Sequence, residues 1–222
     1  MTQTEPDLPS RTRLLEAAIL CFAEKGFDGT GIREIALKAK ANSALVQYHF
    51  GGKTGLYAEA LKHIFSCRPS LVPGPPASPD EPEARAKAIQ ALGDMIGSLL
   101  DELMACREGS DVDKASLLLV TRELQAPREA VATLILEHLR PYTDHMLGCL
   151  RILRPDLDRL EALDHVSSIF GQIVHLQSNL ALYRLIRNDP AFPQDLGAVA
   201  RHITTFSLRG IGIPETLGVV AK

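Results

Sequence analysis

The sequence has few of the features that mark membrane, secreted or catalytic proteins. It contains no run of 18 apolar residues, so no segment is expected to cross a bilayer as a helix. Residues 1–13 lack the apolar stretch of a secretory signal peptide. No GxSxG, GxGxxG, P-loop or HExxH motif occurs, and no carboxylates are paired in a suggestive setting. These absences predict a cytoplasmic protein that is not an enzyme and needs no cofactor or metal.

The cysteines are few and do not form a framework. Cys21, Cys67, Cys106 and Cys149 are far apart, and no CxxC pair occurs. Disulfide scaffolds and zinc sites usually show closer and paired spacings. We therefore expect four free thiols in a reducing cytosol, mostly buried in helices.

Hydrophobic pattern and charge indicate a helical protein with two parts. The chain has 222 residues, of which 45% are hydrophobic, and its apolar residues mostly repeat every three or four positions. Residues 11–62 carry eight Lys and Arg against five Asp and Glu, a balance of +3, so the rest carries −6 of the total of −3. A cationic module on an acidic body suits a DNA-binding domain with a separate regulatory domain, although chance also produces such asymmetry.

Turn and helix signals divide the chain into four segments. Residues 1–9 have no pattern and are predicted to be a disordered arm. Residues 10–68 form a helical DNA-binding domain, and six prolines make residues 69–82 a linker. Residues 83–222 form a helical effector-binding and dimerisation domain, with helices expected near 83–106, 112–124, 128–153, 157–187 and 194–208.

The segment 32–50, IREIALKAKANSALVQYHF, reads as two short helices joined by a tight turn. A helix over about 11–25 precedes it, with Ser10 as its expected N-cap and Gly26 as its end. In the turn, Asn42 or Ser43 can cap the second helix. This order is typical of a helix-turn-helix, whose second helix enters the DNA major groove. The sequence thus predicts an all-α protein with an N-terminal three-helix helix-turn-helix domain and a C-terminal helical ligand-binding and dimerisation domain.

The N-terminal text LLEAAILCFAEKGFDGTGIREIALKAKANSALVQYHFGGKTGLY resembles the DNA-binding domain of TetR/AcrR-type transcriptional regulators. The shared positions are Ile35-Ala36, Tyr48-His49-Phe50, Lys53 and Leu56-Tyr57, in the family's order over roughly 45 residues. The shorter stretches TRELQAP (121–127), HLRPY (138–142) and FGQIVH (170–175) resemble the CecR-like branch. The resemblance implies an all-α homodimer with a divergent ligand-binding domain, and it favours repression over activation.

Three positions depart from the family pattern. Gly31 stands where Thr or Ser commonly caps the second helix, and Gln47 stands where Tyr is common. Lys40 stands where the turn usually has Gly. A positive φ at Lys40 would cost about 1 kcal/mol relative to Gly. We expect its ammonium group to offset this cost by reaching a DNA phosphate.

DNA contacts are expected from the second helix of the motif and its flanks. Asn and Gln side chains can pair with adenine, and Ala can pack on a thymine methyl. Lys53 is the strongest phosphate candidate, because it lies at a helix N-terminus. Packing in the core is the alternative for Tyr48, and capping of the helix is the alternative for His49. The predicted DNA-binding residues are Thr30, Arg33, Lys40, Asn42, Ser43, Ala44, Gln47, Tyr48, His49 and Lys53.

The last two helical segments are apolar around much of their circumference. A helix that is apolar on several faces must be buried on several faces, so we expect a dimer interface, with an ordinary core helix as the alternative. One recognition helix reads only a few base pairs, so specific binding predicts a homodimer on a palindromic operator. The predicted interface residues are Ile169, Phe170, Ile173, Leu176, Leu180, Val199, Ile203 and Phe206.

Polar side chains within the apolar C-terminal helices predict a pocket for an unidentified small-molecule effector. His138, Tyr142, His145 and Cys149 share one helical face, which could line a cavity, form a hydrogen-bonded core or lie at the surface. A metal site is disfavoured because ligands at i and i+7 are roughly 10 Å apart. The predicted pocket residues are Arg122, Glu123, His138, Tyr142, His145, Gln172 and His175.

These patterns together predict a DNA-binding transcriptional repressor that binds its operator as a homodimer and is released by the effector. Double-stranded DNA, the effector and a second copy of the chain are its expected partners, and no membrane is involved. A helical adaptor that binds only protein, or a small enzyme, is the alternative.

Overall fold

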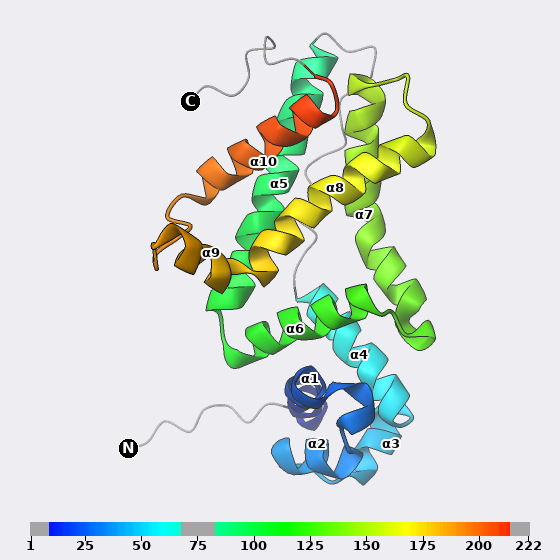
Figure 1. The fold of residues 1–222 in the computed structure, drawn as a ribbon. Coiled ribbons are helices and arrows are strands. Elements are labelled where there is room, and N and C mark those ends of the chain that lie inside the picture. Colours follow the sequence, from blue (N-terminus) through cyan, green and yellow to red (C-terminus); the bar gives the residue numbers. More distant parts are fainter. Residues whose placement is uncertain (1–8, 68–82, 214–222) are drawn as a thin grey trace. The chain divides into compact units, whose positions relative to one another are not determined.

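The computed structural model describes residues 9–67 and 83–213, and these ranges contain helices and no strand (Figure 1). The all-α prediction is therefore confirmed. The predicted arm at 1–9 and linker at 69–82 fall almost entirely outside the described residues. The helices are α1 (Ser10–Gly29), α2 (Ile32–Lys38), α3 (Ala44–Phe50), α4 (Lys53–Ser66), α5 (Ala84–Glu108), α6 (Asp111–Gln125), α7 (Glu129–Leu153), α8 (Arg159–Ser178), α9 (Leu180–Arg187) and α10 (Leu196–Gly210).

The chain divides into two compact units. Unit 1 comprises residues 1–69 and 105–138, and therefore holds α1 to α4, α6 and the first part of α7. Unit 2 comprises residues 70–104 and 139–222, and holds most of α5, the rest of α7 and α8 to α10. The three-helix motif thus shares its unit with α6, a helix that the sequence pattern grouped with the C-terminal segments.

Helix α1 forms the centre of unit 1 because its apolar residues fall on one broad stripe. Its buried side chains include Leu14, Leu15, Ala18, Ile19 and Phe22. Gly26 has a φ of 73°, a conformation that favours glycine, and it ends the regular helix as predicted. The prediction for Ser10 was wrong. The helix starts one residue earlier than expected, so Pro9 occupies the N-cap position and no side chain caps the helix.

Helix α6 packs against α1 within unit 1 and brings a buried carboxylate with it. The Glu123 side chain accepts a hydrogen bond from the Tyr57 hydroxyl of α4. Arg128 donates to Glu123 from its backbone N–H at 3.0 Å and from its Nη1 at 2.8 Å. Its Nη2 also lies 3.2 Å from a carboxylate oxygen of Asp28, in the last turn of α1 beyond the bend at Gly26. Charge-assisted bonds from α4 and the segment after α6 therefore satisfy this carboxylate.

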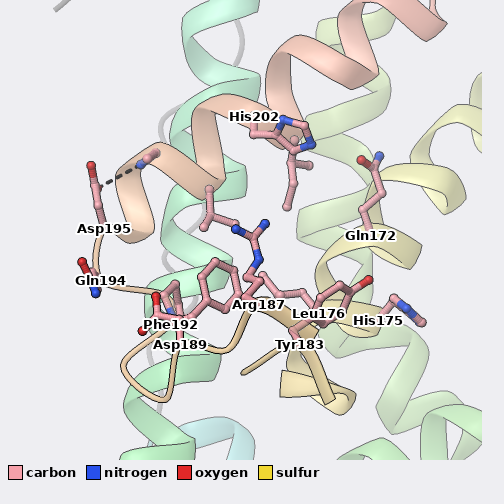
Figure 2. Close-up of a pocket in the computed structure, with 14 residues that line it drawn as sticks. Gln172, His175, Leu176, Tyr183, Arg187, Asp189, Phe192, Gln194, Asp195 and His202 are labelled. Carbon is pink, nitrogen blue, oxygen red and sulfur yellow. Dashed lines mark hydrogen bonds between the residues drawn. The ribbon is translucent and has the colours of Figure 1, made fainter. Parts of the chain in front are cut away.

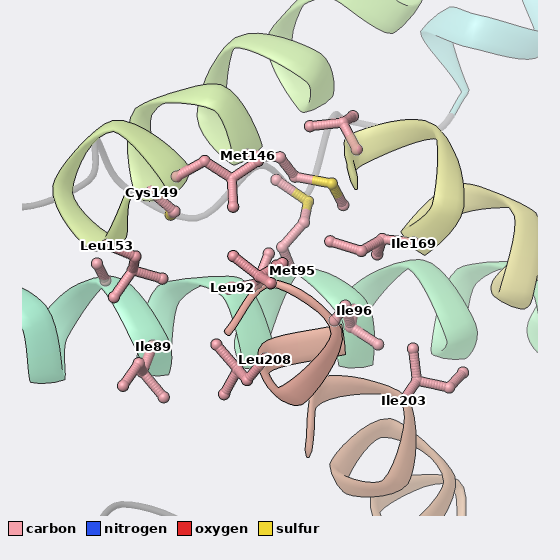
Figure 3. Close-up of a cluster of buried hydrophobic side chains, with 14 of the residues drawn as sticks. Ile89, Leu92, Met95, Ile96, Met146, Cys149, Leu153, Ile169, Ile203 and Leu208 are labelled. Carbon is pink, nitrogen blue, oxygen red and sulfur yellow. The ribbon is translucent and has the colours of Figure 1, made fainter. Parts of the chain in front are cut away.

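Unit 2 has its own apolar core, made by the crossing of α5, α7, α8 and α10 (Figure 3). Leu92 and Ile96 of α5 are fully buried against this core, as are Met146 and Leu150 of α7. Burial also raises the pKa of the Cys149 thiol to about 12, which keeps this side chain protonated. Cys21 and Cys106 are likewise buried, whereas Cys67 is exposed.

The predicted single helix over 157–187 is two helices in the structure, so that prediction was wrong. The break falls at Asn179, whose φ of −112° and ψ of 20° are not helical. Its side-chain Nδ2 donates to the His175 carbonyl at 3.0 Å, and the same carbonyl accepts the Asn179 backbone N–H at 3.0 Å.

No helix of the described ranges is long and apolar enough to cross a membrane.

Candidate DNA-binding surface

The turn between α2 and α3 is held by backbone and side-chain hydrogen bonds. Lys40 has a φ of 49°, in the left-handed region that favours glycine. The Ala41 N–H then donates to the Ala36 carbonyl at 2.9 Å, which folds the chain back on α2. Asn42 Oδ1 accepts the Ala44 N–H at 2.9 Å, so Asn42 rather than Ser43 caps the start of α3. These bonds fix the direction in which α3 leaves the turn.

Helix α3 has one buried face and one open face. Val46 and Phe50 are buried, and the Arg11 guanidinium lies 5.4 Å from the centroid of the Phe50 ring. On the open face Gln47 is exposed and Tyr48 is 81% exposed, so packing in the core is excluded for Tyr48. The open face can therefore approach a DNA groove without any change in the packing of unit 1.

The predicted phosphate contacts differ in how free their side chains are. Arg33 is exposed on α2, and Lys40 is exposed in the turn. The Lys53 Nζ lies 4.6 Å from the centroid of the Phe27 ring and 3.5 Å from the Asp28 carbonyl oxygen. Lys53 therefore helps to hold the last turn of α1 beyond Gly26, and only part of its hydrogen-bonding capacity is directed to solvent.

Thr30 was predicted to contact DNA, and the structure corrects this expectation. The residue is 2% exposed, and its hydroxyl lies 2.7 Å from the Gly26 carbonyl and 3.1 Å from the Cys21 carbonyl. Both acceptors belong to α1, so the side chain satisfies the backbone at the bend after Gly26. Its hydroxyl is not available to a phosphate.

Sequence reasoning missed Leu37, which is 81% exposed on α2 beside the turn. Its position on the helix could have predicted this exposure, because Leu37 lies outside the apolar stripe of α2. The stripe residues Ile35, Ala36 and Ala39 are buried. An exposed leucine next to a recognition helix can make apolar contacts with a thymine methyl or a deoxyribose. Single exposed apolar residues also occur on ordinary surfaces.

Known families match both parts of the chain. The model for the tetR family of bacterial regulatory proteins matches residues 14–60, which include the helix-turn-helix. A model described as the C-terminal domain of the HTH-type transcriptional dual regulator CecR matches residues 88–211, more than half of the chain. The chain belongs to the TetR family. Both the predicted family and its CecR-like branch are confirmed, and members of this family are transcriptional regulators rather than enzymes.

Individual relatives agree with this assignment. The HTH-type transcriptional regulator YttP of Bacillus subtilis is 40% identical over 57 residues, 26% of each chain. The HTH-type transcriptional repressor NicS of Pseudomonas putida is 37% identical over 57 residues, 26% of this chain and 27% of NicS. The matches thus span about a quarter of these relatives. A TetR transcriptional regulator from Agrobacterium tumefaciens has the same fold, with a TM-score of 0.59 at 22% identity, covering 91% of this chain and 94% of that chain.

The residues predicted to line an effector pocket are divided between the two units of this TetR-family regulator. In unit 1, Glu123 is buried and bonded to Tyr57 and Arg128, and Arg122 is exposed. The His138 ring stacks on Phe65 with centroids 3.8 Å apart, and burial lowers its pKa. These three residues have structural or surface positions within unit 1.

In unit 2, Tyr142 and His145 are buried among apolar side chains, in line with the core alternative for this helical face. Burial lowers the pKa of His145, and its Nε2 has no hydrogen-bond partner among the described residues. Gln172 and His175, by contrast, line a surface groove between α8, α9 and α10. Across the described ranges no three His, Cys, Asp or Glu side chains are arranged to hold a metal ion.

The residues predicted at the dimer interface differ in burial. Ile169, Ile173, Leu176, Leu180 and Ile203 are buried within unit 2 of a single chain. Phe170 and Val199 are partly buried against the same core, and Phe206 is exposed. The exposed large apolar side chains of α8, α9 and α10 are Leu160, Val174, Leu182, Leu185, Ile186 and Phe206.

Proposed function

We propose that this TetR-family protein is a transcriptional repressor that binds a palindromic operator as a homodimer and acts in the cytoplasm. The open face of α3 carries the proposal, because it presents Gln47 and Tyr48 to solvent on a helix anchored by Val46 and Phe50. A rigid helix with an exposed polar face is what major-groove readout requires. A protein-binding adaptor would not need this arrangement.

Each exposed residue receives a role from its chemistry. Gln47 can form a bidentate contact with adenine, and Ala44 can pack on a thymine methyl. Asn42 keeps its Nδ2 for DNA while its Oδ1 caps α3. Arg33, Lys40, Ser43 and Tyr48 suit phosphate oxygens, with smaller contributions from His49 and Lys53.

Fluorescence anisotropy of the full chain with DNA from upstream of its own coding sequence tests this proposal. Saturable binding that weakens steeply from about 50 to about 200 mM salt is expected, and it should exceed binding to shuffled DNA by about a thousandfold. Equal affinity for both DNAs at every salt concentration would refute sequence-specific regulation.

The variant Gln47→Ala separates base readout from phosphate contact. We expect it to change the ranking of operator variants, by about 1–3 kcal/mol at the contacted base pair. The matched control is Lys40→Ala, which should weaken binding to all DNAs alike and reduce the salt slope by about one. A uniform loss for Gln47→Ala across all operator variants would argue against its role in readout.

Exposed apolar residues of unit 2 support the homodimer. Leu182, Leu185 and Ile186 lie at i, i+3 and i+4 on α9, so they form one continuous apolar face, and all are exposed in the single chain. Exposed apolar faces of this kind mark interaction surfaces. A second copy of the chain is the partner that also supplies the second recognition helix of a palindromic site.

Repression is supported by one of the relatives. NicS is named a repressor, whereas the CecR family is described as a dual regulator, so activation is the second candidate. An effector that binds one state of the dimer better than the other would weaken DNA binding 5- to 150-fold for a coupling of about 1–3 kcal/mol.

A further inference from the structure

A groove of about 490 Å³ crosses the surface of unit 2 between α8, α9 and α10 (Figure 2). Its apolar walls come from Leu176 of α8, Tyr183 of α9, Phe192 of the following loop and Val199 of α10. Pockets for small molecules usually measure about 300–1,000 Å³ and combine apolar walls with a few polar groups. The groove thus has the size and lining of a small-molecule site.

The Arg187 guanidinium points into this groove above an aromatic ring (Figure 2). Its Cζ lies 4.2 Å from the centroid of the Phe192 ring. Among the described residues no carboxylate lies within 4.0 Å of this guanidinium, so its main contact is the stacking on the Phe192 ring. A guanidinium stacked on a ring keeps its N–H groups free at the edge, where they can bind a carboxylate in bidentate fashion.

The carboxylates that line the groove are already engaged with their own segments. Asp189 Oδ1 accepts the Ala191 N–H at 3.0 Å. Asp195 Oδ1 accepts the Ala198 N–H at 2.9 Å, and its Oδ2 lies 3.3 Å from the Arg201 Nη2. Asp195 therefore caps α10 and is paired with its own arginine. Arg187 is left to attract a negative group from solution.

The loop that carries the Phe192 ring is bonded to α9 through a neighbouring arginine. The Arg184 Nε donates to the Phe192 carbonyl at 2.7 Å, which ties the loop after α9 back to that helix. Arg187 and Tyr183 are one helical turn apart on α9 and both line the groove. A cationic group and two aromatic rings are therefore positioned before any ligand arrives, which lowers the entropic cost of binding.

We propose that this groove binds an amphipathic organic acid, with the carboxylate on Arg187 and the apolar or aromatic body against Tyr183, Phe192 and Val199. The inference rests on the proposed function, because it assigns the effector site of the regulator to the α8–α9–α10 groove. Gln172 and His202 line the opposite side, where they can hydrogen-bond a polar substituent of the acid.

A matched pair of probes tests the charge requirement. Isothermal titration calorimetry of the full chain compares 2-naphthoate with 2-naphthamide, which has the same rings but no charge. We expect the acid to bind about tenfold more tightly than the amide, as one charge-assisted contact at a partly solvated site provides. The chain has no tryptophan, so naphthoate fluorescence gives a second readout with little background.

The variant Arg187→Gln tests the position of the site. It should weaken naphthoate binding about tenfold, to the affinity of the amide, and leave the amide unchanged. The control Arg159→Gln removes an exposed arginine at the start of α8, outside the groove, and should change neither affinity. Circular dichroism verifies that both variants keep the helical content and melting temperature of the native chain.

Other results would overturn the proposal. Absence of saturable binding up to about 1 mM naphthoate, equal affinity for acid and amide, or an Arg187→Gln variant with native affinity would each do so. If light scattering shows that Arg187→Gln lowers the particle mass to that of one chain while naphthoate binding is unchanged, the groove is instead an interface with a second copy of the chain. Anisotropy without any probe measures DNA binding separately. A chain that binds DNA but not naphthoate refutes only the proposed ligand site in the groove. A chain that binds naphthoate but not DNA refutes only the proposed function as a DNA-binding regulator.

Discussion

At the scale of single residues, Lys40 combines a conformational cost with a position suited to DNA contact. Its φ of 49° lies in the left-handed region, where a side chain costs about 1 kcal/mol relative to glycine. We predict that Lys40→Gly raises the free energy of unfolding by up to about 1 kcal/mol while it weakens DNA binding. Urea unfolding and anisotropy on the same preparation measure the two effects.

A glycine elsewhere in the motif provides the control for this change. Lys38 lies within α2, where replacement by glycine should lower the stability by about 1 kcal/mol. Equal losses of stability in Lys38→Gly and Lys40→Gly would show that the conformation of Lys40 carries no cost in the folded protein.

The buried imidazole of His145 predicts a dependence of stability on pH. Burial lowers the pKa of His145 below its ordinary value of 6.5, so the unfolded chain binds a proton more readily than the folded chain. Stability is therefore full above about pH 6.5 and falls as the pH drops towards the folded-state pKa. We predict a lower melting temperature near pH 5 than near pH 7.5, and a smaller difference for His145→Leu.

Two features complete the pH experiment. His138 is shifted in the same direction by burial, so His145→Leu should retain part of the dependence. Met146→Leu changes a neighbouring buried side chain without removing a titratable group, and should keep the native dependence in full. If His145→Leu also keeps it in full, the imidazole is not the source.

In the DNA-binding motif, residue type predicted what a side chain can bind better than it predicted whether that side chain is exposed. Gln47 and Tyr48 are exposed where a recognition helix needs them, because the periodicity of a short amphipathic helix determines which face is buried. Thr30 has a phosphate-binding hydroxyl by type, yet it is buried against the Cys21 and Gly26 carbonyls. Burial of the Thr30 side chain depends on the bend at Gly26, which brings residues 21, 26 and 30 together. Local hydrophobic periodicity does not reveal this contact.

At the scale of elements, the buried carboxylate of Glu123 joins α4, α6 and the start of α7 within unit 1. Removing Arg128 would leave this carboxylate with the Tyr57 hydroxyl and one backbone N–H. We predict that Arg128→Met lowers the free energy of unfolding by about 2 kcal/mol, less than for a fully buried pair because Arg128 is partly exposed. Guanidinium unfolding measures this loss.

Two further variants separate the buried pair from an ordinary surface pair. Lys62→Met removes the exposed partner of Glu59 and should cost less than about 0.5 kcal/mol. Glu123→Gln combined with Arg128→Met removes the stranded charge and should recover part of the loss. Equal costs for Arg128→Met and Lys62→Met would contradict a special role for the buried carboxylate.

The two ends of the chain differ in how far elements could be predicted. The helices of unit 1 were located by glycines and by an apolar stripe, both of which are local signals. The break at Asn179 was not, because the helical spacing of apolar residues continues across it, with Leu176 and Leu180 four residues apart. The apolar residues on α8 and α10 indicated burial correctly, but burial in the chain's own core and burial against a second chain have the same sequence pattern.

At the scale of the whole molecule, the proposed dimer depends on apolar side chains that one chain leaves exposed. Leu185 of α9 is 78% exposed, and replacing it by Asp would place a charge in the proposed interface. The control is Leu136→Asp, which alters an equally apolar residue that is exposed on α7 in unit 1. Both changes should be tolerated by the fold of one chain, because neither side chain is buried.

We predict that light scattering at micromolar concentration gives twice the 24.2 kDa chain mass for the native protein and for Leu136→Asp. Leu185→Asp should instead give the mass of one chain. Its affinity for a palindromic operator should fall by about a hundredfold or more, since one recognition helix then reads one half-site, while its affinity for an isolated half-site stays the same. A native protein that scatters as a single chain while binding the palindrome tightly would refute the dimer and leave the α9 face without a partner.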